Sequence, residues 1–465
     1  MSLSFARAMF PHGRVRVKKS KRYLLYEDGT PFFWLADTWW FAMTSRAKWP
    51  EPFQSIVNQR KKQGFTVSQI VVGYPPEVSL DSENAANSGG FPFLQNGQIN
   101  PAYFEEVDKK IGYLLQAGIV PMIVGSWGHH IDVLGTIKIK ALWQEIIKRY
   151  QHYPVIFCLT GEADIFPDEN YGKKTTPNAI IAIIRTIIPP VISMFFKQHF
   201  PQQIIPVTIN SLEERVKKWD EVARFIKKTL TKPVPLTVHV TPTTSAGELF
   251  HFPDWLDIDS FQSGHDYQSR SYIFEKLQSA ALPRINLEPW YEQIKGEFGA
   301  EDQRYMFWVG LLSGASGISY GAHGVWNMSS TKDEFLDHWG KSDWRTALYF
   351  PGAENITVAK EWIQQFQWNK LKPSIKIVSP QISKKKPLNP VAARCKNDYF
   401  IYVPSGKTTP SIHVHLLQTN KNMTALWINL KTFQSELAFS IYQSSSWKFN
   451  LLTKQDTLLW LHFGK

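Results

Sequence analysis

Short apolar runs rich in β-branched residues alternate with longer amphipathic stretches along the first 330 residues of the chain. The short runs are typical of strands that are buried on both faces, and the stretches between them have the apolar spacing of helices. We predict strands at residues 32–36, 67–73, 120–125, 155–160, 236–240, 258–261, 284–287 and 317–321. Eight such strand and helix units predict an α/β fold with a closed (β/α)₈ TIM barrel.

Residues 101–117 illustrate the helices between these strands. Asn100 can cap the first turn, and Pro101 suits the first helical position. Apolar side chains share one face of this helix, at Phe104, Val107, Ile111, Leu114 and Leu115. Gly118 then ends it.

Two segments are longer than a minimal barrel needs. Residues 75–100 are rich in Gly, Asn and Ser and follow the second strand, so we expect a loop at the rim of the active-site face. Residues 165–213 form an insertion between the fourth and fifth strands, and their sequence indicates no function.

The pattern changes after Trp368. A Pro- and Lys-rich stretch is followed by short alternating runs separated by turn residues, which is typical of a small all-β sandwich. We therefore predict a barrel domain at residues 1–368 and a C-terminal β-sandwich at residues 369–465.

Composition indicates a soluble globular protein, with 43% hydrophobic and 20% charged residues. Cys158 and Cys395 lie far apart and predict neither a disulfide framework nor a multi-cysteine zinc site.

The apolar run at residues 180–196 contains Arg185 and two prolines, so we expect a buried or interface helix pair and no membrane span. The N-terminal basic cluster follows a weakly apolar stretch, unlike a secretory signal, which predicts a cytoplasmic protein if the chain is complete.

The charge is unevenly distributed. The net charge is +12, and residues 366–465 alone carry 14 Lys and Arg against three Asp and Glu. One interpretation is solubility, and the other is an anionic partner such as an acidic polysaccharide or a cell envelope. No recognition helix or paired RNA-binding strands accompany the charge, so no nucleic-acid partner is expected.

Polar and aromatic side chains concentrate where the predicted strands end. Barrel interiors favour Val, Ile and Leu, so these groups indicate a site at the C-terminal face. Aromatic faces stack on sugar rings while carboxylates and amides hold hydroxyls, which predicts a carbohydrate site. The candidate substrate-binding residues are Asp37, Trp39, Tyr74, Trp127, His239, Gln262, His265, Trp290, Tyr291 and His323.

Two of the strand-end residues are glutamates. Glu162 follows the fourth predicted strand and Glu288 follows the seventh, so both can face one bound sugar. Retaining glycoside hydrolysis needs a protonated carboxyl and an ionised one about 5 to 5.5 Å apart. The alternative is that one glutamate forms a salt bridge with Arg284 or Lys295.

No cofactor or metal is expected. The histidines lack the helical or HxH spacing of zinc ligands. The glycine-rich nucleotide motifs and the GxSxG nucleophile motif are also missing from the sequence.

Six segments resemble the apiosidase-like glycoside hydrolase family: KRYLLYEDGTPFFWLADTWW, GFTVSQIVV, NPAYFEEVDKKIGYLLQAGIVPMIVGSWG, VIFCLTGEAD, FQSGH and INLEPWYE. That family pairs a (β/α)₈ catalytic domain with a C-terminal β-sandwich often labelled as collagen-binding. The resemblance implies Glu162 as the acid/base, Glu288 as the nucleophile, and pocket positions at Asp37, His239, Gln262, His265 and Tyr291. Gly161 and Glu162 stand where the family often has Gly and Asp, and larger retaining clans place Asn before the acid.

The expected function is a retaining glycoside hydrolase that cleaves an O-glycosidic bond in an oligo- or polysaccharide. The alternative is a carbohydrate-binding or envelope-associated protein that kept the barrel and lost catalysis. The loop at residues 75–100 would close a pocket for terminal sugars if it folds over the mouth, or leave a groove if it folds back.

Overall fold

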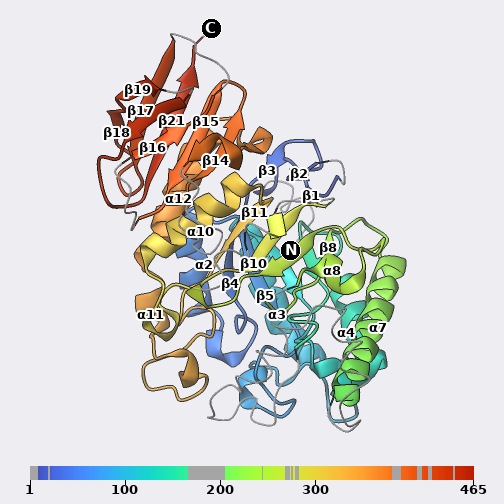
Figure 1. Cartoon of the computed structure of the whole chain (residues 1–465). Coiled ribbons are helices and arrows are strands. Elements are labelled where there is room, and N and C mark those ends of the chain that lie inside the picture. Colours follow the sequence, from blue (N-terminus) through green and yellow to red (C-terminus); the bar gives the residue numbers. More distant parts are fainter. Residues whose placement is uncertain are drawn as a thin grey trace.

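A closed ring of eight parallel strands forms the centre of the molecule (Figure 1). The computed structural model describes residues 9–18, 21–165, 205–242, 244–267, 273, 276–277, 282–379, 389–405, 411–416, 422–443 and 446–464. The strands are β4 (Trp34–Trp39), β5 (Val67–Val71), β6 (Val120–Val124), β7 (Ile156–Cys158), β8 (Leu236–Thr237), β9 (Asp259–Gln262), β10 (Arg284–Glu288) and β11 (Gly317–Tyr320), in the order β8-β7-β6-β5-β4-β11-β10-β9. The predicted (β/α)₈ barrel is confirmed.

Hydrogen bonds join the two remaining edges of the sheet, at β8 and β9. The Asp257 amide donates to the Leu236 carbonyl at 3.0 Å. The Thr237 hydroxyl donates to the Ile258 carbonyl at 2.8 Å. These bonds satisfy the backbone groups that an open edge would leave exposed.

The first barrel strand begins two residues later than the sequence predicts. Pro31 and Phe32 belong instead to a three-stranded antiparallel sheet that precedes the barrel. Its strands are β1 (Val15–Arg16), β2 (Leu24–Tyr26) and β3 (Pro31–Phe32). Pairing of Leu24 with Phe32 uses the backbone groups that a longer β4 would have needed.

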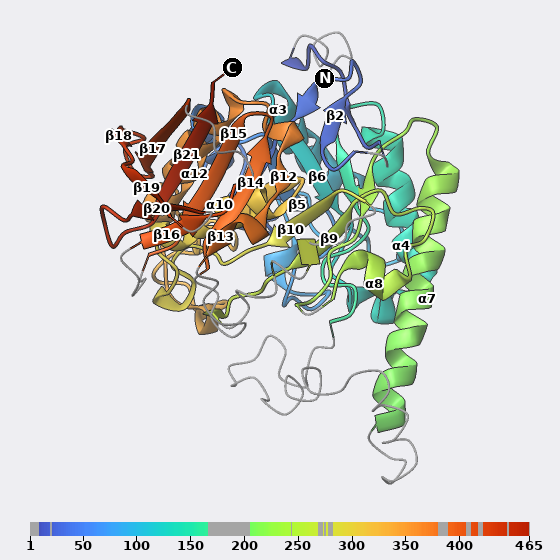
Figure 2. The same cartoon turned by 45° about the horizontal axis from the view of Figure 1, so that its top comes forward.

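Helices surround the barrel. They are α2 (Phe53–Lys62), α3 (Pro101–Gln116), α4 (His130–Tyr150), α7 (Ile205–Thr229), α8 (Ala246–Phe250), α10 (Ala300–Ser313), α11 (Trp344–Ala347) and α12 (Pro351–Gln364). Helix α3 begins as predicted, because the Asn100 side chain accepts from the Ala102 amide at 3.1 Å, and Gly118 follows its end with a φ of 77°. Helix α7 lies beside α4 and projects beyond the barrel (Figure 2).

Most of the predicted insertion lies outside the described residues, as does the apolar run at residues 180–196. In the part of the chain that the structure describes, no helix is long and apolar enough to cross a membrane.

Two antiparallel sheets follow the barrel and form the predicted β-sandwich (Figure 1). One sheet contains β12 (Lys372–Pro373), β14 (Val391–Cys395), β15 (Asp398–Val403), β21 (Thr457–Phe463), β17 (Met423–Asn429) and β18 (Ser435–Leu437). The other contains β13 (Val378–Ser379), β16 (Ser411–Val414), β20 (Ser446–Asn450) and β19 (Ser440–Gln443). Apolar side chains such as Ile412, Trp427, Phe449 and Leu459 are buried in the core of the sandwich.

The sandwich packs against α10 and α12 of the barrel (Figure 1). Eleven of the 14 residues of α10 are buried, as expected for a helix enclosed between two layers. Arg304 of α10 donates two hydrogen bonds to Asp456 of the sandwich, at 2.7 and 2.6 Å. Both side chains are almost fully buried, so this contact, which we call the seam ion pair, fixes one position of the sandwich.

Candidate active site

Glu162 and Glu288 lie at the carboxyl ends of their strands. Glu162 follows β7 by four residues and is partly exposed, whereas Glu288 is the last residue of β10 and is buried. The ring of His239 contacts both residues, because its Nδ1 accepts from the Glu162 amide at 3.2 Å and its Nε2 lies 3.3 Å from Oε2 of Glu288. The structure therefore brings together the two glutamates that the sequence analysis selected.

Neutral donors hold the Glu162 carboxylate. Gln262, the last residue of β9, donates to Oε1 at 2.6 Å, and the indole of Trp127 donates to Oε2 at 3.1 Å. Both donors are buried, so their positions are fixed by packing. A carboxyl group held in this way keeps its position without an opposite charge beside it.

The backbone at Glu162 is unusual for a residue with a side chain. Its φ of 41° lies in the left-handed region, where non-glycine residues are uncommon and strained. Its amide donates to Nδ1 of His239 at 3.2 Å, which helps to hold this conformation. Strain of this kind is concentrated at functional sites because it aims a side chain.

Position 161 holds Gly in this chain, where larger retaining clans have Asn, and the position of the Trp127 ring explains the difference. A Cβ at position 161 would overlap the ring of Trp127, the residue that donates to Glu162. A side chain at this position and the Trp127 ring therefore exclude each other. In this chain Trp127 and Gln262 supply the donors to Glu162.

Two imidazoles face Glu288. Nε2 of His265 lies 3.0 Å from Oε1, and Nε2 of His239 lies 3.3 Å from Oε2 without the alignment of a full hydrogen bond. In each ring Nδ1 accepts a backbone amide, from Glu162 at His239 and from Tyr291 at His265. An accepting Nδ1 places the proton on Nε2 of a neutral imidazole, so both rings direct an N–H toward Glu288.

These surroundings separate the pKa values of the two glutamates. Burial, together with the negative charge of Glu288, raises the pKa of Glu162 to about 7. Burial alone would also raise the pKa of Glu288, but its interactions with His239 and His265 outweigh burial and lower that pKa to about 2. At neutral pH the pair therefore combines an ionised Glu288 with a Glu162 that can hold a proton.

Tyr291 and Trp40 complete the inner wall. The charge of Glu288 adds to burial in raising the pKa of the Tyr291 hydroxyl well above its ordinary value, which keeps this group protonated. Trp40 packs edge-on against Trp127 and His239, with ring centroids 5.4 and 5.8 Å away. Trp40 was not among the predicted site residues, although it directly follows the strand-end residue Trp39.

The rim contains a partly exposed aromatic residue that the sequence analysis missed. Trp339 lies in the loop after β11, and its ring meets His265 edge-on at 5.8 Å. Its indole donates to Glu77 at 2.8 Å, and the ammonium group of Lys295 lies 4.6 Å from its ring centroid. Glu77 belongs to the loop at residues 75–100, so this predicted rim loop reaches across to Trp339. Nothing in the local sequence signals this pairing, because its partners are 262 residues apart.

Several predicted substrate-binding residues lie behind this wall. Asp37 is fully buried and accepts from Arg60 at 2.5 Å and from the Trp39 indole at 2.7 Å. Trp290 is stacked between Phe298 and Tyr305 with no exposed surface.

Tyr74 and His323 are also buried. Tyr74 stacks on Phe93 with centroids 6.5 Å apart. His323 uses both ring nitrogens, with the Trp326 indole and with the Gly340 carbonyl. The substrate contacts of these residues and of Asp37, Trp39 and Trp290 remain predictions.

The salt-bridge alternative for the glutamates finds no support in the described residues. Arg284 pairs with Asp259 at 2.7 Å, and Lys295 lies over Trp339. Within the ranges that the structure describes, no three His, Cys, Asp or Glu side chains are grouped to hold a metal ion.

Solved structures share the fold of this chain over nearly its whole length. One solved structure, named as a glycoside hydrolase, is 19% identical, with a TM-score of 0.75 and 98% of each chain covered. Another, a glycoside hydrolase family 5 protein from Bacteroides vulgatus ATCC 8482, is also 19% identical, with a TM-score of 0.76 and coverage of 98% of this chain and 94% of that one. At this identity these likenesses show the fold.

The family is shown by the sequence. The chain belongs to the apiosidase-like family, whose catalytic-domain model matches residues 18–370. The predicted resemblance is thus confirmed, and the protein falls in the glycoside hydrolase class. A comparison with curated proteins finds no match.

Proposed function

We propose that this protein hydrolyses an O-glycosidic bond in an oligo- or polysaccharide by a retaining mechanism. The observation that carries the proposal is the opposite shift of two neighbouring carboxyl pKa values, to about 7 at Glu162 and about 2 at Glu288. A retaining glycosidase needs one carboxyl that donates a proton and another that is already ionised.

Glu288 is the nucleophile in this mechanism. Its carboxylate attacks the anomeric carbon and forms a glycosyl-enzyme ester, while Glu162 gives its proton to the leaving oxygen. Glu162, now ionised, removes a proton from water, and the water oxygen attacks the anomeric carbon and releases Glu288. The N–H groups of His239 and His265 hold the Glu288 carboxylate for its attack.

Trp127 and Gln262 hold Glu162 in both protonation states. Each donor contacts a different carboxylate oxygen, so each oxygen keeps a further lone pair that can carry the proton when Glu162 acts as an acid. The hydroxyl of Tyr291 stays protonated beside Glu288, which supports a role in orienting the nucleophile.

Trp339 offers a stacking surface for a sugar ring at the rim. Its ring is partly exposed, touches His265, and is fixed by Glu77 on its indole edge. A flat ring held in this way binds the apolar face of a sugar with little loss of side-chain entropy.

The test is the stereochemical course of the reaction together with the loss of Glu288. We expect NMR of the first product to show the anomeric configuration of the substrate, and Glu288→Gln to lose activity by on the order of 10⁴-fold or more. Inversion of configuration would exclude the nucleophilic role of Glu288. Binding of glycans with no released sugar from any of them would favour the carbohydrate-binding alternative.

A further inference from the structure

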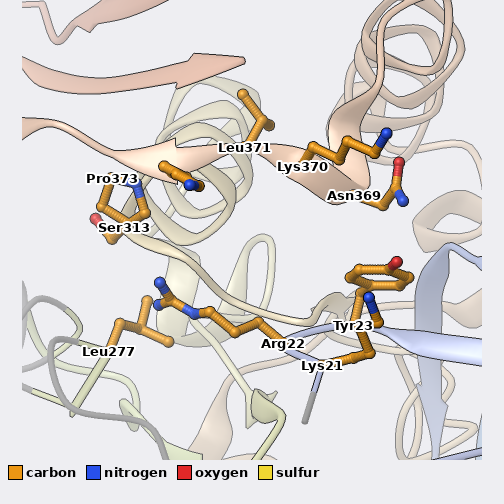
Figure 3. A pocket seen from close by; sticks show the side chains of 10 residues that line it. Lys21, Arg22, Tyr23, Leu277, Ser313, Asn369, Lys370, Leu371 and Pro373 are labelled. Atoms are coloured by element: carbon orange, nitrogen blue, oxygen red, sulfur yellow. The ribbon is translucent and has the colours of Figure 1, made fainter. Parts of the chain in front are cut away.

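A cavity lies at the other end of the barrel from Glu162 and Glu288. It has a volume of about 510 Å³ and opens between residues 21–23 and the segment that leads into the sandwich (Figure 3). Ser313, the last residue of α10, also lines it and lies just before the amino end of β11. Because catalytic groups of such barrels lie at the carboxyl ends of the strands, the cavity is separate from the candidate active site.

The walls of this cavity, which we call the basal cavity, are positively charged. Lys21 and Arg22 lie along one side and Lys370 lies on the opposite side (Figure 3), and Lys372 also lines the cavity. Among the described residues that line the cavity, none is acidic. In the described part of the chain, none of these four side chains forms an ion pair. Like charges facing a concave space repel one another, and a bound anion relieves that repulsion.

The backbone around Arg22 is fitted to this arrangement. Gly314 has a φ of 103°, and a Cβ at this position would overlap the Arg22 guanidinium. The carbonyl of Arg22 accepts from the Ser316 hydroxyl, which ties the segment to the start of β11. The positive φ favours glycine at this position, and the absence of a side chain leaves the space that the Arg22 guanidinium occupies.

The remaining walls suit a sugar ring better than a small inorganic ion. Tyr23 offers an aromatic face, and Leu371 and Pro373 are apolar. Asn369 supplies an amide, and the hydroxyl of Ser313 has no hydrogen-bond partner among the described residues. The volume lies in the range of about 300 to 1,000 Å³ that is typical of sites for organic ligands.

We propose that the basal cavity binds an acidic sugar residue of a polysaccharide, through its anionic group and one ring face. The choice of a polysaccharide rests on the proposed glycosidase function. Contact at the basal cavity would retain a charged polysaccharide on the protein while another part of that polysaccharide, or a neighbouring polysaccharide, reaches the mouth of the barrel.

The test uses two oligosaccharides of equal length that differ in charge, a β-1,4-linked glucuronate oligomer and the corresponding cello-oligosaccharide. Binding is measured by calorimetry at low salt for the full-length protein, for Lys370→Gln/Lys372→Gln, and for the control Lys217→Gln/Lys228→Gln. The control removes the same charge from exposed lysines of α7, which lies away from the sandwich (Figure 1).

We expect Lys370→Gln/Lys372→Gln to bind the glucuronate oligomer at least about tenfold more weakly, because each lost charged contact removes a charge-assisted hydrogen bond. The control variant should bind it as the unmodified protein does. An equal loss of affinity in the control variant would overturn the proposal, because the net positive charge of the whole protein would then explain binding of the oligomer. Inorganic phosphate binding as tightly as the oligomer, with the same lysine dependence, would also overturn it.

The result is separable from the proposed function. Release of aryl alcohol from a small neutral glycoside should be unchanged in Lys370→Gln/Lys372→Gln. Lysine-dependent binding without any hydrolysis would support the basal cavity and contradict the glycosidase. Hydrolysis without lysine-dependent binding would contradict the basal cavity alone.

Discussion

The carboxylates at the mouth of the barrel and at the seam with the sandwich have different partners. Asp456 at the seam accepts two hydrogen bonds from the cation of Arg304. Glu162 at the mouth is held by neutral donors, Gln262 and Trp127. Burial raises the pKa of Asp456, and the Arg304 cation opposes that rise, whereas at Glu162 burial and the charge of Glu288 together raise the pKa to about 7.

The comparison distinguishes stability from chemistry. The seam ion pair cannot exchange a proton usefully, because Arg304 stays charged, so it serves to hold two layers together. The surroundings of Glu162 at the mouth raise its pKa to about 7. The free-energy cost of placing a carboxyl group there is compatible with function, because proton transfer needs a group that titrates near neutral pH. Changing one partner in each region should therefore affect different properties of the protein.

Among changes at Glu162 and at the seam, the largest expected effect is on turnover in Glu162→Gln. We expect a loss of about 10³-fold on a glycoside with a poor leaving group, because general acid catalysis contributes about 10² to 10⁴-fold. A dinitrophenyl glycoside needs no proton at its leaving oxygen, so formation of the glycosyl-enzyme should be nearly unaffected. Burst kinetics on the two substrates measure the difference.

The pH profile provides the matching check. Glu162 must be protonated to donate, so kcat/KM of the unmodified protein should fall as pH rises through about 7. Glu288 must be ionised, so the acid limb should appear only as pH falls toward about 2. Glu162→Gln should lose the alkaline limb, and an unchanged limb would assign the proton donor to another group.

A change at the seam ion pair should lower the free energy of unfolding and leave the chemistry of the active site unaffected. Arg304→Met leaves Asp456 buried without its cation, which we expect to lower the free energy of unfolding by about 3 to 5 kcal/mol. Urea denaturation measures this change. The double variant Arg304→Met/Asp456→Leu should recover most of it, because no uncompensated charge remains.

Arg224→Met is the control for the seam. Arg224 pairs with Asp220 and Asp254 at the surface, and its loss should change stability little. If Arg304→Met were no more destabilising than Arg224→Met, the seam ion pair would not hold the two layers together.

A smaller effect is expected from the donors of Glu288. His265→Ala removes the N–H 3.0 Å from Oε1, and a hydrogen bond to a charged group corresponds to roughly 10 to 100-fold in rate. The pKa of Glu288 should rise without this donor, which moves the acid limb of kcat/KM to higher pH. His265→Gln supplies an amide donor and should recover part of both changes. An acid limb that stays in place in His265→Ala would exclude this role.

The sequence predicts the parts of this molecule that are set by local pattern. Strands buried on both faces produce continuous apolar runs, so all eight barrel strands could be located. The glutamates could be selected because catalytic groups of such barrels follow strand ends. Asp37 follows the end of the first predicted strand, yet in the structure it lies within β4 and pairs with Arg60 of α2 inside the wall. That difference depends on how a helix packs, which the residue types at the strand end do not encode.

Contacts between loops that are distant in the chain could not be predicted from the sequence, because these contacts also depend on how the elements pack. Trp339 becomes part of the rim only because Glu77, from another loop, holds its indole. The seam ion pair likewise joins residues 152 positions apart.

The smallest predicted effect concerns this rim, where neither a charge nor a proton is exchanged. Trp339→Ala should raise KM about five- to tenfold and leave kcat nearly unchanged, since stacking of the sugar on an aromatic face is present in both the bound substrate and the transition state. Trp344→Ala is the matched control, because Trp344 is another partly exposed tryptophan, in α11, that contacts Arg345 and not His265. Initial rates over a range of oligosaccharide lengths separate KM from kcat. A fall in kcat with unchanged KM would show instead that Trp339 acts on Glu288 through His265, and the rim would then belong with the catalytic pair.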